Sequence, residues 1–227
     1  MQESEAFVTI KDHKDNFPNS LSFRLINPSK SDIGKISKTI LDKINQAIIN
    51  KTKVNQWKNT SEVIKWFENI TNKKHSSFIN FDVENFYPSI SLKLFTDAIN
   101  YAKNIIDIND QELAIIMQSR KTLLFQNGEP WVKKSSDQDF DVPMGCFDGT
   151  EVCDTTGLFL LHQLSHIVKK SDIGLYRDDG LGIIQNMPKP EIERMKKTMV
   201  KVFKECGLSI IIECNLKTVN FLDVTLD

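Results

Sequence analysis

Alternation of apolar and polar residues marks several short segments of the chain, and each of them predicts a β-strand. Residues 7–11 and 21–26 alternate on either side of a polar turn, which predicts a hairpin. Ser77-Phe-Ile-Asn-Phe-Asp82 alternates in the same way and ends on a carboxylate. Phe125-Gln-Asn-Gly-Glu-Pro-Trp131 predicts a second hairpin, turned at its Asn-Gly pair. The remaining alternating segments lie at about residues 173–177, 181–185, 208–213 and 219–226.

A period of 3.6 residues predicts helices between these strands. Residues 34–50 show it, with apolar side chains at positions 36, 40, 41, 44, 47 and 48. Asp148 and Glu151 have the spacing of a capping box before a long helix, and Pro190 suits the first turn of another. The predicted helices span residues 34–50, 60–70, 91–104, 109–122, 149–169 and 190–206. Strands and helices in this order predict an α+β fold, with an antiparallel sheet backed by helices.

The composition is that of a soluble globular protein, with 40% hydrophobic and 26% charged residues. A length of 227 residues allows one large domain or two small ones. No run of 18 apolar residues occurs, so no membrane span is expected, and Met1-Gln-Glu-Ser-Glu lacks the apolar segment of a secretory signal. The four cysteines lack the spacing of a zinc site and are interpreted as reduced packing residues. We therefore expect an intracellular protein that is not secreted, in either the nucleus or the cytoplasm.

The net charge of −1 hides an uneven distribution along the chain. Residues 1–80 carry 13 basic and 8 acidic side chains, whereas residues 81–227 carry 16 basic and 22 acidic ones. A basic first part suits contact with phosphate groups, and an acidic second part suits a metal site. Surface lysines also commonly serve only solvation, so the distribution alone does not decide between these functions.

Three carboxylates carry the candidate chemistry. Asp82 ends one predicted strand, and Asp178 and Asp179 lie together at the tip of a tight hairpin. If the two strands lie side by side, Asp82 and Asp178 meet at one edge of the sheet. Carboxylates in that position repel each other unless a divalent cation lies between them, and Mg²⁺ prefers such oxygen ligands. A pair of Mg²⁺ ions about 3.5–4 Å apart is a common device of phosphoryl transfer. The alternative is that Asp-Asp-Gly is only a polar turn.

The residues around these carboxylates favour the metal site. Phe81-Asp82-Val-Glu-Asn-Phe-Tyr87 resembles the first catalytic motif of reverse transcriptases, and Tyr176-Arg177-Asp178-Asp179 resembles the second. Further segments resemble motifs of the same family in the same order along the chain. These are Lys11 and Arg24-Leu-Ile26 in the fingers, Val142-Pro-Met144-Gly145, Gly207-Leu208 with Asn215-Leu-Lys217, and Phe221-Leu222-Asp-Val224 at the primer grip. The last segment is most similar to Penelope-like retroelements, whose catalytic domains are similar to that of telomerase.

The resemblance implies the fingers and palm of a right-hand polymerase. It assigns residues 1–76 to the fingers and residues 77–227 to the palm, with fingers-side helices at about 91–122. The chain begins inside the fingers and ends just past the primer-grip motif, so no thumb is expected.

The resemblance also implies roles at the metal site. Asp82 and Asp178 would bridge two Mg²⁺ ions, or Mn²⁺ in their place, and the carbonyl of Val83 would complete one coordination shell. Asp179 would be the accessory carboxylate. Lys217 is a candidate general acid for the leaving pyrophosphate; the alternative is an ordinary turn lysine.

For the incoming dNTP, the resemblance implies that Lys11 and Arg24 neutralise the triphosphate, with Lys14 as an alternative to Lys11. Tyr87 occupies the position of an aromatic steric gate, which collides with a ribose 2′-hydroxyl and favours deoxynucleotides. Met144 and Gly145 would line the same site, although Met144 replaces the glutamine usual in the family.

The resemblance places a second group of residues at the primer and template. Arg177, Phe221 and Leu222 would contact these strands. Arg177 fills a position where relatives carry smaller or apolar residues, and pairing with a catalytic carboxylate is its alternative role.

We therefore expect a template-directed DNA polymerase, a reverse transcriptase, with two-metal nucleotidyl transfer from a dNTP to a primer 3′-hydroxyl. Its partners would be dNTPs and a primed RNA or DNA template, without a membrane; the oligomeric state is left open. One alternative is an RNA-dependent RNA polymerase. Another is a catalytically inactive nucleic-acid-binding remnant of a retroelement.

Overall fold

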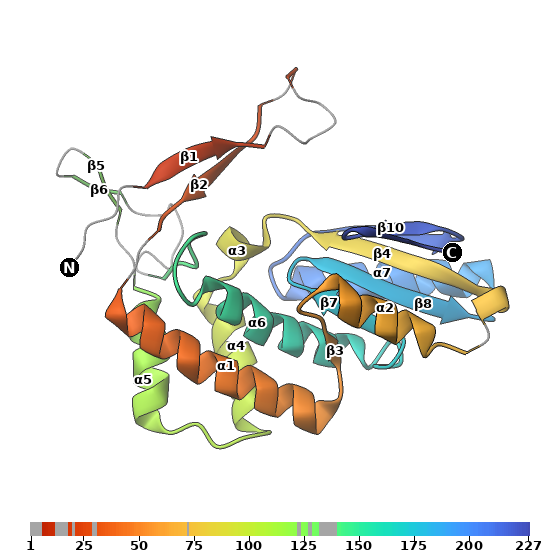
Figure 1. Cartoon of the computed structure of the whole chain (residues 1–227), viewed down its shortest axis with the longest axis horizontal. Helices are drawn as coiled ribbons and strands as arrows, with labels where there is room; N and C mark the ends of the chain where they lie inside the picture. Colours follow the sequence, from red (N-terminus) through yellow and green to blue (C-terminus); the bar gives the residue numbers. More distant parts are fainter. Residues whose placement is uncertain are drawn as a thin grey trace.

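The computed structural model describes residues 6–11, 18–19, 21–28, 31–71, 73–121, 124–126, 129–131 and 140–227. At its centre lies a five-stranded sheet in the order β3-β7-β8-β4-β9 (Figure 1). Its strands are β3 (Asn55–Gln56), β4 (Ser76–Val83), β7 (Ile173–Tyr176), β8 (Asp179–Gln185) and β9 (Ile210–Leu216). β3 pairs with β7 in parallel, whereas the other neighbours are antiparallel. The α+β prediction is confirmed, but the prediction of a purely antiparallel sheet was wrong because β3, two residues long, shows no alternation.

Three two-stranded antiparallel ribbons accompany the sheet. They pair β1 (Phe7–Ile10) with β2 (Phe23–Ile26), β5 (Leu124–Gln126) with β6 (Glu129–Trp131), and β10 (Val219–Phe221) with β11 (Val224–Leu226). The single strand predicted over residues 219–226 was wrong. Leu222 adopts a φ of 51°, in the left-handed region, and reverses the chain there. The turn residues 127 and 128 lie outside the described residues.

The helices follow the predicted periodicity closely. They are α1 (Asp32–Thr52), α2 (Thr60–Glu68), α3 (Phe86–Ser89), α4 (Leu92–Lys103), α5 (Asp110–Ser119), α6 (Gly149–Leu164) and α7 (Lys189–Glu205), with a 3₁₀ turn over Lys73–His75. Side chains of Ser31, Asn59, Ser91 and Asn109 accept hydrogen bonds from backbone N–H groups in the first turns of α1, α2, α4 and α5. The long helix predicted over residues 149–169 ends earlier, at Leu164.

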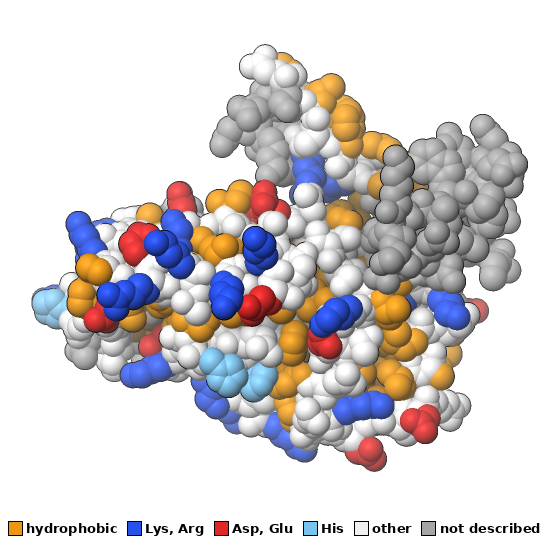
Figure 2. All heavy atoms as spheres, turned by 180° about the vertical axis from the view of Figure 1, so that it is seen from behind, with side chains coloured by type: hydrophobic (Ala, Val, Ile, Leu, Met, Phe, Trp, Pro, Cys, Tyr) orange, Lys and Arg blue, Asp and Glu red, His pale blue; other side chains and the backbone are white. Residues whose placement is uncertain are grey.

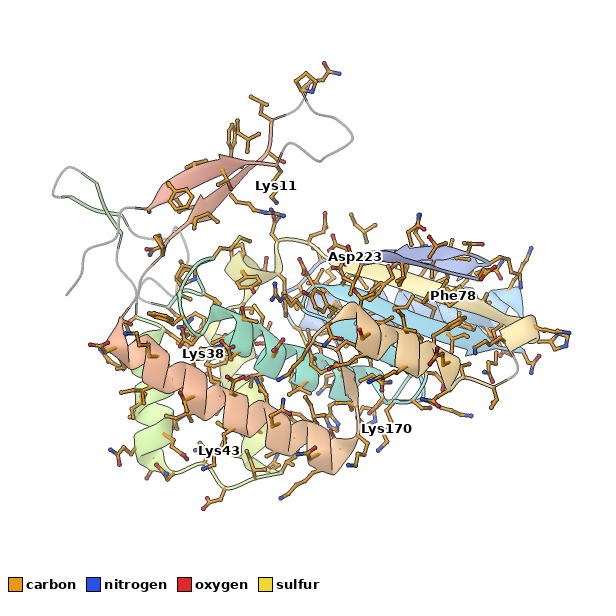
Figure 3. The ribbon with its side chains drawn as sticks, in the orientation of Figure 1. Lys11, Lys38, Lys43, Phe78, Lys170 and Asp223 are labelled. Atoms are coloured by element: carbon orange, nitrogen blue, oxygen red, sulfur yellow. The ribbon has the colours of Figure 1, made fainter. Side chains whose placement is uncertain are left out.

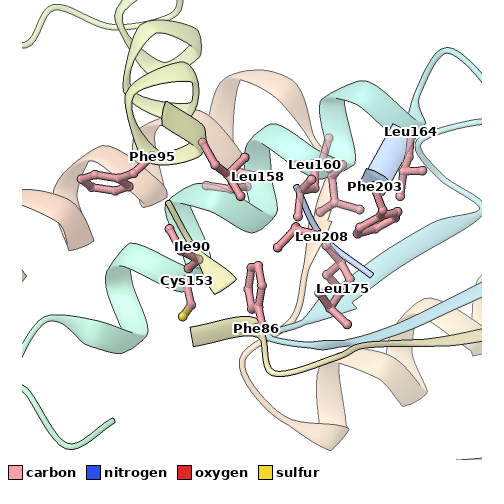
Figure 4. Close-up of a cluster of buried hydrophobic side chains, with 14 of the residues drawn as sticks. Phe86, Ile90, Phe95, Cys153, Leu158, Leu160, Leu164, Leu175, Phe203 and Leu208 are labelled. Atoms are coloured by element: carbon pink, nitrogen blue, oxygen red, sulfur yellow. The ribbon is translucent and has the colours of Figure 1, made fainter. Parts of the chain in front are cut away.

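Each face of the sheet packs against its own set of buried side chains. Ile79, Phe81 and Val83 of β4 point toward α6 and α7, into the larger core shown in Figure 4. Phe78 points to the opposite face, where α2 and the β10–β11 ribbon cover a second cluster with Trp57. Because side chains alternate along a strand, β4 contributes to both cores. A shift of one residue would move each side chain to the wrong core, so the packing fixes the register of β4.

The β1–β2 ribbon projects away from the sheet and its helices (Figure 1). Its described strand residues are exposed or half-buried, and Phe7, Val8 and Phe23 are 51%, 60% and 54% exposed. It is anchored just after β2, where Asn27 donates a backbone hydrogen bond of 2.8 Å to the carbonyl of Met144. The predicted boundary between fingers and palm at residue 76 stays a prediction. α1, which precedes this boundary, packs in the same core as α4, α5 and α6, which follow it.

The cysteines and two histidines are packing residues in the described structure. All four cysteines are free thiols, and Cys153 is fully buried. His162 stacks on Tyr101 with ring centroids 4.6 Å apart and meets His166 edge-on, so both histidines have packing partners. None of the helices in the described ranges has the length and apolar character needed to cross a membrane.

Candidate active site

The three predicted carboxylates lie at one end of the two central strands. Asp82 of β4 is the register partner of Asp179 of β8, so their side chains project from the same face of the sheet. Directly opposed residues in antiparallel strands have Cβ atoms about 4.5–5.5 Å apart. Asp178 lies in the turn before β8, and its carbonyl accepts a 2.9 Å hydrogen bond from the N–H of Val83. The strand register thus pairs Asp82 with Asp179, whereas we expected Asp178 to meet it.

The turn that carries Asp178 depends on its neighbours. Arg177 has a φ of 55°, which turns the chain sharply between β7 and β8. Gly180 is the register partner of Phe81, and a Cβ atom at Gly180 would lie 2.0 Å from the ring of Phe81. Glycine is therefore required there, and the aromatic ring of β4 lies against the backbone directly after the two aspartates.

Negative charges lie close together at this end of the sheet. The pKa of Asp179 rises to about 6, first because the carboxyl is partly buried and then because Asp178 and Asp82 are negatively charged. The three carboxylates therefore act on one another. A cation placed among them would relieve the repulsion and lower that pKa.

The donor set suits Mg²⁺, although it is not a closed protein cage. Within the described residues, no three acidic, histidine or cysteine side chains are arranged to hold a metal ion by themselves. Mg²⁺ usually binds proteins through one or two carboxylates and completes its shell with waters and substrate phosphates. Asp82, Asp178 and Asp179 fit that open mode of binding, and not the closed mode of a structural metal site.

Tyr87 lies beside the carboxylates on the short helix α3, which follows β4. Its hydroxyl is 3.5 Å from Oγ1 of Thr150 in the first turn of α6. Burial raises the pKa of Tyr87, and the neighbouring Cys153 adds to the rise. The ring is half-buried near the start of α6, and the charge of Arg177, in the turn that carries Asp178, reaches its hydroxyl.

Met144 and Gly145 lie in the loop that precedes α6, and this loop contacts the end of β2. Ile26 bridges to Met144 in parallel, and Met144 accepts the backbone bond from Asn27. Gly145 has a φ of 100°, and an added Cβ would lie 3.1 Å from Ile26 and 3.3 Å from the carbonyl oxygen of Asn27. This loop ties the base of the β1–β2 ribbon to the start of α6.

Lys11 and Arg24 lie on the β1–β2 ribbon, as predicted for the hairpin (Figure 3). Arg24 is the register partner of Thr9, and the backbone N–H of Lys11 donates to the carbonyl of Ser22 at 2.8 Å. Arg24 is exposed and Lys11 half-buried. Lys14, the alternative to Lys11, lies outside the described residues.

The structure does not bring Lys217 to the carboxylates. Its Nζ donates to the carbonyl of Ser76 at 3.1 Å, at the opposite end of β4 from Asp82. Seven residues of extended strand separate the two ends by about 20 Å. Lys217 therefore cannot protonate a group bound at Asp82, and we do not retain the general-acid assignment.

The three residues assigned to the primer and template have different surroundings. Phe221 is 3% exposed and packs edge-on against Trp57 with centroids 5.7 Å apart, so it is a core residue. Leu222 is half-buried in the turn between β10 and β11. Arg177 is exposed and lies over the ring of Tyr176, 5.3 Å from its centroid. Only Leu222 and Arg177 are placed to meet a bound strand.

A buried ion pair near the site was not predicted. Arg120, 1% exposed, pairs with Asp148 just before α6, and Ser119 donates a 2.7 Å hydrogen bond to the same carboxylate. Asp148 makes no capping hydrogen bond, and Glu151 is buried against Lys38. The capping-box interpretation was therefore wrong. No local pattern could have indicated this pair, because Arg120 and Asp148 lie 28 positions apart in different elements.

Asp154 is a second site residue without a sequence signal. It follows Thr150 by one helical turn and accepts a 3.3 Å hydrogen bond from Nε2 of Gln56. Burial raises the pKa of Asp154 to about 6, Glu151 adds to the rise, and the charge of Arg177 opposes it. The arginine of the turn therefore lies within electrostatic reach of α6.

The arrangement of sheet, ribbon and helices matches solved polymerase structures. The RNA-dependent RNA polymerase of a human picorbirnavirus superposes with a TM-score of 0.62 at 11% identity, over 92% of this chain and 41% of that one. Apo telomerase from Candida tropicalis, truncated from its C-terminal domain, gives a TM-score of 0.58 at 13% identity, over 86% of this chain and 43% of that one. The chain has the fingers-and-palm fold of right-hand polymerases.

Telomerase from Candida albicans, solved with a fragment of telomeric RNA, gives a TM-score of 0.54 at 11% identity, over 85% of this chain and 36% of that one. The present chain thus spans less than half the length of each of these polymerases. No protein-family model matches the sequence, and no curated protein matches it either. At identities this low, the likeness concerns the fold.

Proposed function

We propose that this chain is the catalytic core of a template-directed nucleotide polymerase, and that it makes DNA. The observation that carries the proposal is the grouping of Asp82, Asp178 and Asp179 at one end of β4 and β8, beside Tyr87, within a polymerase fold. A polar turn alone gives no reason for three mutually repelling carboxylates at that place.

Each residue has a distinct task in this proposal. Asp82 and Asp178 would hold Mg²⁺, with Asp179 as the accessory carboxylate and Val83 offering its carbonyl. Bound Mg²⁺ would activate the primer 3′-hydroxyl and stabilise charge on the leaving pyrophosphate. Arg24 and Lys11 would neutralise the triphosphate from the β1–β2 ribbon.

Tyr87 supports DNA as the product. Its ring is held against α6 by contacts near Thr150 and Cys153, so it is fixed in place when a nucleotide enters. A ring in this position would collide with a ribose 2′-hydroxyl and admit deoxyribose. A reverse transcriptase from a retroelement, of the Penelope-like kind that Phe221-Leu-Asp-Val224 resembles, is the finer form of the proposal.

RNA synthesis is the second candidate, since viral RNA polymerases are among the matching structures. The test is primer extension on an RNA template with Mg²⁺, supplied with dNTPs or with rNTPs. We expect extension with dNTPs and a loss on the order of a thousandfold in Asp178→Asn, since several kcal/mol of transition-state stabilisation depend on this carboxylate. Asp107→Asn, which changes an exposed carboxylate between α4 and α5, is the matched control and should retain activity.

Three outcomes would count against the proposal. Equal extension by the wild type and Asp178→Asn contradicts the site. Extension with rNTPs but not dNTPs favours the RNA polymerase. A chain that binds labelled RNA but extends no primer under any of these conditions favours the inactive remnant.

A further inference from the structure

A hollow lies at the β3 edge of the sheet, outside the group of carboxylates. It has a volume of about 780 Å³, within the range of protein ligand sites. Its walls come from the end of α1, from β3 and α2, and from the segment between α6 and β7. Ser171 and Asp172 line it just before β7, and Gln185 lines it at the end of β8. Because β8 runs seven residues from Asp179 to Gln185, the Gln185 end of the hollow is about 20 Å from the carboxylates. Its Gln56 end is nearer, at about 10 Å, since Gln56 pairs with Leu175 and Leu175 pairs with Gly180 in the next strand.

Four lysines line this hollow. Lys53 follows α1, Lys58 precedes α2, Lys65 lies on α2, and Lys169 lies between α6 and β7. All four are exposed, and within the described residues none of their ammonium groups forms a salt bridge. These lysines come from three separate parts of the chain. They are therefore not simply successive charges on the solvent-exposed face of one helix.

The acidic residues of the hollow are already engaged. Glu62 accepts a 2.9 Å hydrogen bond from the backbone N–H of Lys58 as part of the α2 cap. Asp172 accepts a 2.7 Å hydrogen bond from the hydroxyl of Ser171. Two carboxylates thus oppose four ammonium groups, and the hollow has an excess of positive charge in a chain whose net charge is −1.

The floor of the hollow is rigid. Trp57 and Trp66 are 4% and 9% exposed and lie with ring centroids 5.1 Å apart. Nε1 of Trp66 donates a 2.7 Å hydrogen bond to the carbonyl of Ser171, which fixes the wall that carries Lys169. The backbone next to the lysines is therefore held in place, and less backbone entropy is lost when an anion binds them.

Positive charge continues beyond the hollow. Lys170 lies next to Lys169, near the end of α1 (Figure 3), and Lys74 follows the lining residue Thr71. Residues 51–75 carry six lysines and two glutamates. On the rear face of the molecule, by contrast, basic and acidic side chains are interspersed (Figure 2). An extended row of cations suits a polyanion better than a single small anion.

We propose that this lysine-lined hollow binds the phosphate backbone of a nucleic-acid strand. It would hold template or product about 10–20 Å from the carboxylates, or about three to six nucleotides at 3.4 Å each. The inference rests on the proposed function only for the identity of that strand, because the hollow needs no catalysis to bind it. Either RNA or DNA supplies the same phosphate chemistry, and the test distinguishes them.

The test measures binding, in a chain that carries Asp178→Asn so that turnover plays no part. The variant that removes charge from the hollow, called the groove variant, combines Lys53→Gln, Lys65→Gln and Lys169→Gln. The matched control is Lys189→Gln, Lys197→Gln and Lys204→Gln, which removes the same charge from exposed positions on α7. Fluorescein-labelled 20-nucleotide RNA and DNA single strands of one sequence are titrated at 50 to 200 mM NaCl, with anisotropy as the readout.

We expect the groove variant to bind on the order of tenfold to a hundredfold more weakly at 0.1 M salt. The slope of log K against log salt should become shallower by about 2, since each lost phosphate contact to a single strand contributes about 0.7. The control should lose less than about threefold. Melting temperatures of both variants near that of the parent exclude unfolding as the cause.

Each remaining outcome supports or overturns the proposal. A selective loss for RNA or for DNA supports it and identifies the strand. Equal effects of the groove and control variants overturn it, and so does a poly-glutamate peptide that binds the parent as tightly as RNA. If the groove variant loses binding while the wild type extends no primer, only the proposed catalytic function fails.

Discussion

Among single residues, Asp154 best shows how burial adjusts charge next to the candidate site. The folded chain holds its pKa at about 6, above the ordinary value of 3.8, mainly through burial. The ionised form is therefore disfavoured in the folded state. Stability from the neutral form is fully present below pH about 4 and is lost as the pH rises through about 6.

We predict that Asp154→Asn raises the free energy of unfolding by about 1–2 kcal/mol at pH 7.5, because asparagine imitates the neutral acid. The gain should be clearly smaller at pH 4.5, where the folded carboxyl is protonated, and should vanish only below pH about 4, where the unfolded carboxyl is protonated as well. Urea unfolding of both chains at the two pH values measures it. A gain that is as large at pH 4.5 as at pH 7.5 would show that charge is not the cause.

In the proposed function, Tyr87 is the residue on which the choice of sugar would depend. Tyr87→Ala should lower the preference for dNTPs over rNTPs by about tenfold or more, because the wall that excludes the 2′-hydroxyl is removed. Tyr87→Phe keeps the ring and loses only the hydroxyl near Thr150, so its preference should remain. Ratios of kcat/KM for the two nucleotides decide the matter, and an unchanged ratio in Tyr87→Ala would remove the argument for DNA synthesis.

Metal binding at Asp82 and Asp178, as proposed, should be visible without any substrate. We expect 10 mM Mg²⁺ to raise the melting temperature of the wild type by a few degrees, since a ligand that binds only the folded state stabilises it. EDTA should reverse the shift, and Asp82→Asn should abolish it. An equal shift in the wild type and Asp82→Asn, measured by calorimetry, would place the bound metal elsewhere.

At the level of elements, periodicity predicted most helices, because each of these has a buried and an exposed face, and it predicted β4 and β8, whose apolar side chains alternate or run together between the two cores. It could not identify β3, which has only two residues, or the turn at Leu222, whose conformation glycine would normally mark. Asp82 was predicted to meet the Asp178-Asp179 turn only if the two strands lie side by side, and the structure supplies that adjacency and pairs Asp82 with Asp179. The placement of Lys217 did not, because it depends on how far β9 runs along β4.

The pair of Arg120 and Asp148 ties α5 to the start of α6 and gives another prediction. Asp148→Ala should lower the free energy of unfolding by about 3–5 kcal/mol, because it leaves the Arg120 charge buried and unpaired. Arg120→Met combined with Asp148→Ala should recover part of the loss. Glu205→Ala, which breaks the exposed pair with Lys201, should cost less than about 0.5 kcal/mol.

Chemical denaturation with two probes measures these three variants. If Asp148→Ala costs no more than Glu205→Ala, the buried pair does not stabilise the junction. A double variant that is less stable than Asp148→Ala would show that Arg120 finds another partner once Asp148 is removed.

For the whole molecule, stability should be distributed very unevenly. The central strands β4 and β8 lie between two cores, whereas the described strand residues of the β1–β2 ribbon include no buried side chain. We predict that amides of the ribbon exchange hydrogen through local opening, while those of β4 and β8 exchange only on global unfolding. Hydrogen exchange by mass spectrometry measures this, and equal protection of β4 and the ribbon would contradict it.

The order of strands in the sheet also governs how the protein can be made. Both neighbours of β4 in the sheet, β8 and β9, are synthesised about a hundred or more residues after it. Until they arrive, a nascent chain ending before Asp178 presents β4 with two open edges and no complete site. Pairings this distant in sequence fold slowly. The strand that carries Asp82 is therefore where chaperones are most needed during synthesis, and where aggregation of an unfinished chain would begin.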